Sequence, residues 1–248
     1  MPAGTPSEVR GATAGARDRR ASIASLPRRP DALLLDFDGV IVDSIPVKLG
    51  AYLRLYENER PEHLQAIRDH QRSHGGVTRR IKFRYFESEV FGRAVTDADI
   101  ERLSDAFTRL VHEAVIACPM IPGALDLLRR AHGRASMHVV SGTPQEELVD
   151  IVGRRRLAAF FESVHGAPAG KRDTFERILR ERGYRPERVL AIGDALTEYD
   201  AAASLGIPFL GVVAGGDGAT FPPGVATVPT LEGVADALGF EDPGRRAD

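Results

Sequence analysis

Two acidic residues, separated by a single residue, end an apolar run near the beginning of the chain. Residues 32–40 read ALLLDFDGV, so Asp36 and Asp38 follow a stretch suited to a buried strand. Side chains two positions apart point to one side of an extended chain, and Gly39 lets the backbone turn away tightly. Two adjacent carboxylates favour a divalent cation, and Mg²⁺ takes oxygen ligands while leaving room for a substrate phosphate. The pair predicts half of a metal and phosphoryl site, although the same motif also occurs in plain surface turns.

A second polar turn follows another apolar run. Residues 139–147 read VVSGTPQEE, which puts Ser141 and Gly142 at the end of a predicted strand. A serine hydroxyl and the free backbone N–H groups around a glycine can hold a phosphoryl oxygen, although a structural serine turn has the same sequence. Thr143 and Glu146 match the N-cap and capping-box positions of the following helix, so we expect Thr143 to be structural.

One cation and two further acids occur in the last third of the chain. In GAPAGKRDTFERIL, residues 166–179, Lys171 lies between a loop and an amphipathic helix, where a lysine among carboxylates can neutralise a transferring phosphoryl group. In VLAIGDALTEYD, residues 189–200, Asp194 follows an apolar strand and is suited to ligate a metal. Glu198 lies about one helical turn later, where it either acts through water or orients Lys171.

Short apolar runs separated by helical patterns must position these residues. The predicted strands are residues 32–37, 137–141, 189–192 and 209–213, with weaker candidates at 160–165 and 226–228. Their alternation with helices predicts an α/β fold, a Rossmann-like parallel sheet core with helices on both faces. Because ligands of such sheets bind at the carboxyl ends of the strands, the turns after Asp36, Ser141 and Asp194 are expected to meet.

A long helical insertion separates the first two predicted strands. Roughly a hundred residues lie where a crossover of about a dozen would suffice. Residues 46–118 are predicted to form an all-α cap domain with helices at 47–57, 61–74, 79–91 and 97–117, the last with a capping pair at Thr96 and Asp99. Residues 31–45 and 119–240 then form the core, between a basic tail at 1–30 and a short tail at 241–248.

The combination of motifs resembles the haloacid dehalogenase-like hydrolase superfamily, specifically its phosphatase branch. The resemblance covers about residues 31–240 and rests on the ordered set DFDGV at 36–40, Ser141, Lys171, and Gly193-Asp194 with Glu198. It implies a Rossmann-like core, a helical cap after the first motif, Mg²⁺ dependence and an aspartyl-phosphate intermediate. Dehalogenases do not need the second acid, Asp38, and phosphonate-cleaving members lack it, so the phosphatases match best.

The resemblance also implies a role for each motif residue. Asp36 would attack phosphorus, while Asp38 would protonate the leaving alkoxide and later deprotonate water. The phosphoryl oxygens would be bound by Ser141, Gly142 and Lys171. The Mg²⁺ ligands would be Asp36, Asp194 and the backbone carbonyl of Asp38, with Glu198 in support.

The cap motif HGGVTRRIKFRYF, residues 74–86, leaves an alternative open. Arg79 resembles the cap arginine with which sugar-phosphate mutases bind a distal phosphate, so a β-phosphoglucomutase-like enzyme is the main alternative. Against it, the serine and leucine that follow this arginine in the mutases are Lys82 and Phe83 here, and Lys48 stands where they have a histidine. For each basic residue taken alone, the pattern favours a solvated helix face over an aromatic cap core rather than substrate contact. A non-catalytic phosphometabolite-binding protein and a receiver-like signalling domain fit the acids and the cap less well.

Composition favours small-molecule chemistry, and the resemblance implies a small phosphorylated metabolite, such as a sugar or polyol phosphate, as the partner. A net charge of −2, 43% hydrophobic and 27% charged residues give no bias toward nucleic acid or an anionic membrane, and no apolar stretch reaches the ~20 residues of a membrane span.

Residues 1–30 contain six arginines against two acids and no continuous apolar segment, which indicates a disordered tail rather than a secretory signal. A single cysteine fits a reducing compartment, so we expect the cytoplasm. The oligomeric state is left open.

Overall fold

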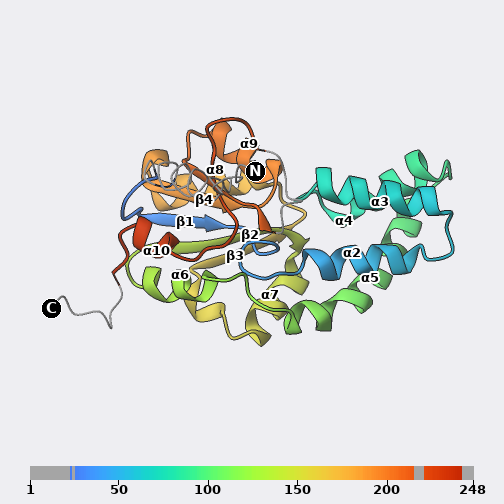
Figure 1. The fold of residues 1–248 in the computed structure, drawn as a ribbon, viewed down its shortest axis with the longest axis horizontal. Coiled ribbons are helices and arrows are strands. Elements are labelled where there is room, and N and C mark those ends of the chain that lie inside the picture. Colours follow the sequence, from blue (N-terminus) through green and yellow to red (C-terminus); the bar gives the residue numbers. More distant parts are fainter. Residues whose placement is uncertain (1–22, 24–25, 215–220, 242–248) are drawn as a thin grey trace, which may run out of the picture.

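The computed structural model describes residue 23 and residues 26–214 and 221–241 of the chain. Most of the predicted tails at 1–30 and 241–248 therefore lies outside the described residues. Within them, the chain folds into an α/β core from which a bundle of helices projects (Figure 1).

A six-stranded parallel sheet forms the centre of the core. Its strands, in the spatial order β3-β2-β1-β4-β5-β6, are β1 (Ala32–Leu35), β2 (Ser136–Pro144), β3 (Ser163–Ala167), β4 (Val189–Gly193), β5 (Phe209–Val212) and β6 (Ala226–Val228). Each neighbouring pair is parallel. The predicted Rossmann-like fold is confirmed, and β1 lies between β2 and β4, so the motifs that follow these three strands are spatial neighbours.

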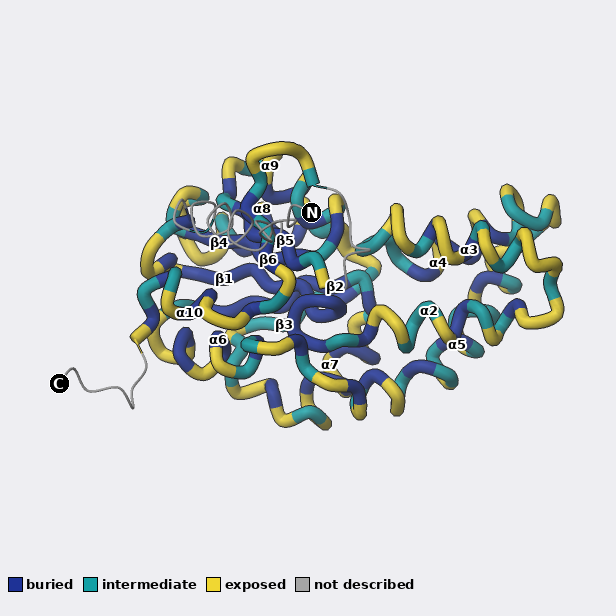
Figure 2. Tube along the Cα trace, viewed as in Figure 1, coloured by how far each residue is buried: buried dark blue, intermediate teal, exposed yellow. Residues whose placement is uncertain are grey.

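Helices cover both faces of the sheet because the apolar side chains of β1 alternate. Leu33 and Leu35 belong to one buried cluster with α6 (Ala124–Ala131), α7 (Gln145–Arg154) and α10 (Val234–Ala237). Ala32 and Leu34 belong to the other cluster, with α8 (Lys171–Arg182) and α9 (Leu196–Ser204). Short 3-10 turns span Ala158–Phe160 and Pro186–Arg188. Figure 2 shows the central strands β1 and β4 as buried, and every residue of both strands is buried.

The segment between β1 and β2 consists of helices. They are α2 (Ile45–Leu55), α3 (Pro61–Ser73), α4 (Arg79–Tyr85), which continues as a π-helical turn at Phe86–Val90, and α5 (Asp97–Ala117). The rings of Tyr52, Phe83 and Phe107 pack against one another at the centre of this cap, with centroid separations of 4.4–5.9 Å. The predicted capping pair at the start of α5 is confirmed, because Thr96 and Asp99 form a capping box.

The two chain crossings between core and cap lie side by side. The Asp43 N–H donates to the Pro119 carbonyl at 2.9 Å, and the Ile121 N–H donates to the Ile41 carbonyl at 3.0 Å. Val42 and Met120 form an antiparallel bridge at the same place. The cap is thus attached through one short paired tether.

Two local predictions are wrong. β2 continues to Pro144 and α7 begins at Gln145, so Thr143 is a strand residue and not the predicted N-cap. The basic segment of α4 is also not a wholly solvated face, because Arg79 and Lys82 are buried. Their burial reflects contact with the core, which a local pattern does not encode.

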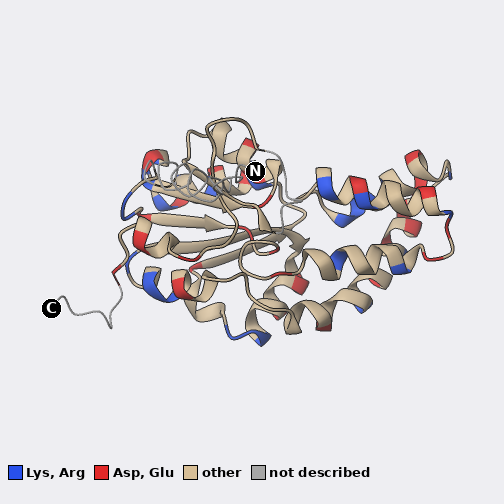
Figure 3. Cartoon of the chain, viewed as in Figure 1, with Lys and Arg blue, Asp and Glu red and all other residues tan. Residues whose placement is uncertain are grey.

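Charged side chains are otherwise mixed over both parts of the molecule. Figure 3 shows acidic and basic residues interspersed along the cap and core helices. This agrees with the small net charge of the chain, −2. Among the described residues, no helix combines the length and the apolar character that crossing a membrane would require.

Candidate active site

The central acid of the site is Asp36, which follows β1 directly. Its backbone N–H donates to the Ile192 carbonyl of β4 at 2.9 Å, and the Phe37 N–H donates to its Oδ1 at 2.6 Å. The side chain is 4% exposed. Burial raises the pKa of Asp36 to about 7, with further upward contributions from Glu198 and Asp38, while Lys171 opposes the shift.

Lys171, the first residue of α8, is the cation that faces this acid. Its Nζ lies 3.0 Å from Asp36 Oδ2 and 2.8 Å from Glu198 Oε1, and it donates to the Val140 carbonyl at 2.6 Å. Burial alone would lower the pKa of Lys171, but the charges of Asp36 and Glu198 outweigh it and raise that pKa. The ammonium is therefore held charged between two carboxylates and the end of β2.

An acidic cluster next to Lys171 has the donors of a metal site. Carboxylate oxygens of Asp36, Asp194 and Glu198 lie within 4.8 Å of one another. The pKa of Asp194 is raised well above its usual value by burial and by the charges of Asp36 and Glu198, and Lys171 opposes this shift only in part. Gly39, at φ +75°, passes so close that a Cβ there would lie 2.3 Å from Asp194 Oδ2. A buried, all-oxygen donor set with three acids against one lysine fits Mg²⁺.

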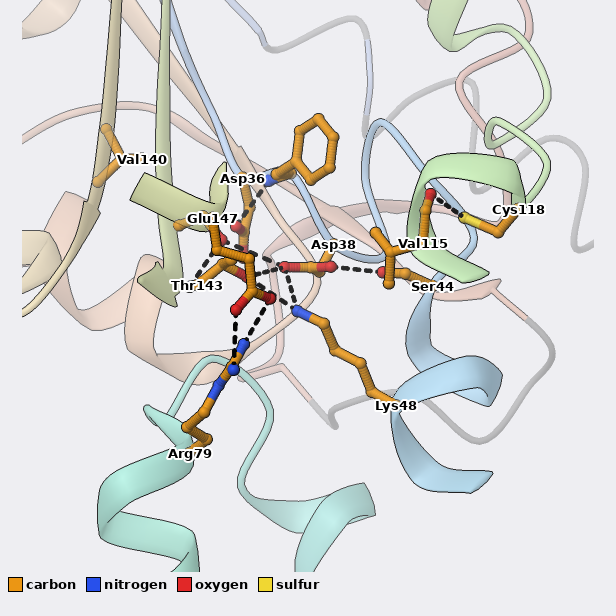
Figure 4. A network of polar contacts seen from close by, with 12 residues as sticks. Asp36, Asp38, Ser44, Lys48, Arg79, Val115, Cys118, Val140, Thr143 and Glu147 are labelled. Carbon is orange, nitrogen blue, oxygen red and sulfur yellow. Dashed lines mark hydrogen bonds and ion pairs between the residues drawn. The ribbon is translucent and has the colours of Figure 1, made fainter. Parts of the chain in front are cut away.

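Asp38 has a different environment from that of Asp36. Its Oδ1 accepts from the Ser44 hydroxyl at 2.5 Å, and its Oδ2 lies 2.6 Å from Lys48 Nζ, as Figure 4 shows. Oδ2 also accepts from the hydroxyls of Thr143 at 2.9 Å and Ser141 at 3.2 Å. Burial alone would raise the pKa of Asp38, but Lys48 and the hydroxyl donors lower it to about 2. One motif thus places two aspartates in environments that shift their pKa values in opposite directions.

The turn at the end of β2 borders the same site. The Ser141 hydroxyl donates to Asp38 and accepts from the Thr143 N–H at 3.1 Å. Gly142 is covered by the cap, since a Cβ on it would lie 3.0 Å from the Gly76 carbonyl oxygen. The seven core residues predicted from the motifs, Asp36, Asp38, Ser141, Gly142, Lys171, Asp194 and Glu198, are therefore brought together, whereas their individual roles stay predictions.

The cap loop before α4 closes over this site. A Cβ on Gly76, at φ +74°, would lie 1.9 Å from the Thr197 hydroxyl and 2.8 Å from Glu198 Oε1, and one on Gly75 would lie 3.0 Å from the Ala195 Cβ. These contacts leave no space for a side chain at Gly76.

Two polar residues of the site were assigned no site role from the sequence. Lys48 of α2 pairs with Asp38 and donates to the Thr143 hydroxyl at 2.9 Å, and that hydroxyl bridges to Asp38. The sequence did not indicate a site role for Thr143, because this residue fits the pattern of a helix N-cap. One feature of the sequence could have indicated Lys48: it lies one helical turn after Ser44, at the start of the first cap helix.

Arg79 is placed differently from the distal-phosphate contact that the resemblance implies. It is 6% exposed, and its Nη1 and Nη2 donate to Glu147 Oε2 and Oε1 of α7 at 2.9 and 2.7 Å (Figure 4). Its Nη1 also donates to the Thr108 hydroxyl of α5 at 2.6 Å. In this arrangement two of its nitrogens connect the cap to the core, and a substrate role for Arg79 stays a prediction.

Two cavities meet at the site. A small one of about 70 Å³ is lined by Asp36, Asp38 and Asp194 from the core and by Gln71 and Lys82 from the cap. A larger cleft of about 1240 Å³ between cap and core is lined by Lys171 and Thr197 among others. Gly76, Ser141 and Gly142 line both, so the large cleft leads to the acids.

The arrangement supplies the components of phosphoryl transfer. The Asp36 carboxylate lies beside a lysine and within a cluster suited to a divalent cation, and a second acid, Asp38, stands two residues away. Preorganised positive charge around a site of developing negative charge is the largest contributor to catalysis of such reactions. The same set does not match thiol chemistry, since Cys118 is a buried thiol that donates to the Val115 carbonyl.

Two curated proteins resemble the chain in sequence over most of its length. A phosphoglycolate phosphatase of Synechococcus elongatus is 23% identical over 182 residues, which cover 71% of this chain and 80% of the relative. A phosphorylated carbohydrates phosphatase of Thermotoga maritima is 25% identical over 182 residues, which cover 71% of this chain and 82% of the relative.

A solved structure confirms the fold. The magnesium-bound putative HAD-hydrolase YfnB of Bacillus subtilis superposes with a TM-score of 0.65 at 18% identity, covering 86% of this chain and all of that one. Residues 30–206, well over half of the chain, match the family of haloacid dehalogenase-like hydrolases. The stretch that matches contains every acid and lysine of the site, and the chain is an enzyme of the haloacid dehalogenase-like hydrolase family.

Proposed function

We propose that the protein is a Mg²⁺-dependent phosphatase that hydrolyses a small phosphate monoester through an aspartyl-phosphate at Asp36. The observation that carries the proposal is the position of the Asp36 carboxylate, 3.0 Å from Lys171 Nζ and within the acidic cluster that contains Asp194 and Glu198. A nucleophile so placed meets phosphorus where cations offset the charge of the transferring group.

In the first step, an oxygen of Asp36 bonds to phosphorus and the ester P–O bond breaks. The leaving alkoxide takes a proton from Asp38, and the phosphoryl oxygens are held by Lys171, the Ser141 hydroxyl and the backbone around Gly142. In the second step, Asp38 removes a proton from water, which attacks phosphorus and releases phosphate with Asp36 regenerated. Bound Mg²⁺, held by Asp36, Asp194 and the Asp38 carbonyl, would supply positive charge to the phosphoryl group.

Asp38 must change protonation between these two steps. The pKa of about 2 that Lys48 and the hydroxyl donors impose keeps Asp38 ionised, which is the state that the second step requires. The first step requires the protonated acid, so the Lys48–Asp38 contact has to weaken when substrate binds. We therefore assign Lys48 the role of controlling the protonation of Asp38.

The substrate class follows from the site and the relatives together. Curated relatives are named for phosphoglycolate and for phosphorylated carbohydrates, and both are small phosphate monoesters. With a single cysteine in 248 residues, the chain suits a reducing cytoplasm that contains such metabolites. A sugar phosphomutase is the alternative. It would need a cation for a second phosphate, and the candidate Arg79 already pairs with Glu147.

The test is release of phosphate from a panel of small phosphate monoesters with and without Mg²⁺. We expect Mg²⁺-dependent release that falls by at least about 10³-fold in Asp36→Asn, which keeps the shape of the nucleophile but removes its charge. Interconversion of sugar-phosphate isomers without release would instead assign a mutase. Tight binding of phosphate esters without either reaction would assign a non-catalytic binding protein.

A further inference from the structure

The cap wall of the 70 Å³ cavity carries two polar side chains that the proposed mechanism does not use. Lys82 belongs to α4, one helical turn after Arg79, and Gln71 belongs to α3. Both line this cavity together with Asp36 and Asp38 of the core.

Lys82 is buried without a hydrogen-bond or ion-pair partner among the described residues. Its side chain is 6% exposed, and among the described residues its ammonium group has no hydrogen-bond acceptor and no acid within ion-pair distance. The nearest aromatic surface is the ring of Tyr52, whose centroid is 6.0 Å from Lys82 Nζ. Arg79 on the same helix is buried to the same extent but has Glu147 as its counter-ion. A buried ammonium without an anion is costly, so its retention here requires a reason.

Gln71 adds a second unsatisfied group to the same wall. Its Oε1 is buried and has no hydrogen-bond partner within the described part of the chain. Rotation of the amide exchanges its oxygen and nitrogen, so this position can present an N–H donor as readily as an acceptor. Because buried polar atoms are normally paired, an unpaired ammonium and an unpaired amide on one cavity wall indicate a ligand.

The acids nearest to Lys82 cannot serve as its counter-ions. Its charge is favoured by Asp194, Asp38 and Glu198, but burial and the charge of Lys48 act more strongly and lower the pKa of Lys82 to about 8. Asp38 is paired with Lys48 and Glu198 with Lys171, while Asp194 belongs to the cluster suited to a metal. Once a metal and a phosphoryl group occupy the core side, the missing negative charge has to come from the rest of the substrate.

We propose that Lys82 and Gln71 bind a carboxylate on the leaving group, so that the preferred substrates are phosphate monoesters of hydroxy acids. The inference rests on the proposed function and deepens it. A hydroxyl would satisfy the hydrogen bonds but not the charge, whereas a carboxylate supplies one negative charge and planar acceptors for both donors.

The experiment compares two esters of equal carbon number, 2-phosphoglycolate and 2-hydroxyethyl phosphate, which differ in the carboxylate. We expect the wild type to prefer 2-phosphoglycolate in kcat/KM. Lys82→Met keeps the length and packing of the side chain without its charge, and it should reduce this preference by about 10- to 100-fold, the value of a hydrogen bond to a charged group. Gln71→Met should reduce it by a smaller factor, and it serves as the second test if Lys82→Met does not fold.

Arg84→Met is the matched control. Arg84 lies on the same helix but is exposed and pairs with Asp97, so its replacement should leave the preference unchanged. Circular dichroism and the thermal midpoint show whether each variant is folded. A wild type that hydrolyses both esters equally, or a Lys82→Met variant that loses both activities by the same factor, overturns the carboxylate subsite and leaves the phosphatase proposal intact.

Binding measurements separate this inference from the proposed function. If neither ester is hydrolysed, the phosphatase proposal fails, and calorimetric titration with 2-phosphoglycolate still tests the subsite. Binding by the wild type that weakens about 10- to 100-fold in Lys82→Met, and not in Arg84→Met, supports it. Equal affinities in wild type and Lys82→Met, or no binding at all, overturn it.

Discussion

The core side and the cap side of the cavity use their charges differently. On the core side, Lys171 contacts two carboxylates, and the acids gather where a metal would bind. On the cap side, three buried or half-buried cations have three separate environments: Lys48 faces the second acid, Arg79 faces Glu147, and Lys82 has no hydrogen-bond or ion-pair partner among the described residues. The core side is thus built for one reaction, whereas the cap side can vary in what it recognises.

Among the substitutions that test this comparison, replacement of Lys171 should have the largest effect on stability and turnover. Lys171→Met leaves Asp36 and Glu198 as buried acids without their counter-ion, so we expect a loss of about 3–5 kcal/mol in the free energy of unfolding together with loss of turnover. The pKa of Asp36, already about 7, should rise further. Since the ionised acid is then the unfavourable form, the loss should grow above pH 7 and shrink toward pH 5.

Urea unfolding at several pH values measures the effect of Lys171→Met. Arg172→Met, at the exposed neighbouring position, is the control and should unfold like the wild type. A variant whose stability loss was independent of pH would show that Lys171 does not balance the acids of the core side.

The Arg79–Glu147 pair should hold the cap to the core. Glu147→Gln leaves the buried Arg79 guanidinium without its counter-ion and should cost about 3 kcal/mol in the free energy of unfolding. Arg79→Met should cost a similar amount, and the double variant should cost less than the sum of the two. Urea unfolding of the four proteins gives this double-mutant cycle. Full stability of Arg79→Met combined with a selective loss of activity on bisphosphates would instead assign Arg79 to the substrate.

Lys48→Met should change the chemistry with less effect on folding. Without Lys48, burial is less opposed and the pKa of Asp38 rises from about 2, which favours the protonated acid of the first step and disfavours the base of the second. We expect kcat to fall by about 10- to 100-fold while a rapid first burst of alcohol release persists. Rapid-quench kinetics with an aryl phosphate measures both. Loss of the burst itself would contradict the proposal that Lys48 acts by keeping Asp38 ionised for the second step.

The smallest expected effect is on the pH dependence of stability. It concerns two buried histidines, His70 in α3 of the cap and His138 in β2 of the core. Burial lowers both pKa values to about 4, against about 6.5 in an unfolded chain. The unfolded state therefore binds more protons between these values, and each histidine lowers the free energy of unfolding as the pH falls from about 6.5 to 4.

Replacement of each histidine by glutamine tests this pH dependence. His70→Gln and His138→Gln should each remove about one proton from the uptake on unfolding in that window, as measured from the pH dependence of urea midpoints. An unchanged pH dependence in both variants would show that neither histidine is held neutral.

The core side was largely predictable from the sequence because its polar site residues come directly after the ends of predicted strands. Asp36, Ser141 and Asp194 come after apolar runs, and parallel strands bring their carboxyl ends together whatever the loops between them do. The helix at Asp97–Ala117 was predicted with its observed bounds because a capping box and a regular apolar spacing mark it.

The cap side was less predictable because its contacts join residues far apart in the chain. Nothing local indicates that Arg79 meets Glu147, 68 positions later, and a threonine that fits an N-cap gives no sign of contacting Asp38. One signal was available, since Arg79, Phe83 and Phe86 are spaced as one helical face and the two aromatics had to be buried. That spacing indicates an inward-facing arginine on the same side as the cap core.

The paired tether at Val42 and Met120 has an evolutionary consequence. Because the insertion leaves and re-enters the core at one antiparallel bridge, a segment of different length or sequence can replace it without disturbing the strand order. Substrate preference and bond-breaking machinery can then be inherited separately, and a transplanted cap would bring its own selectivity to an unchanged set of reacting groups.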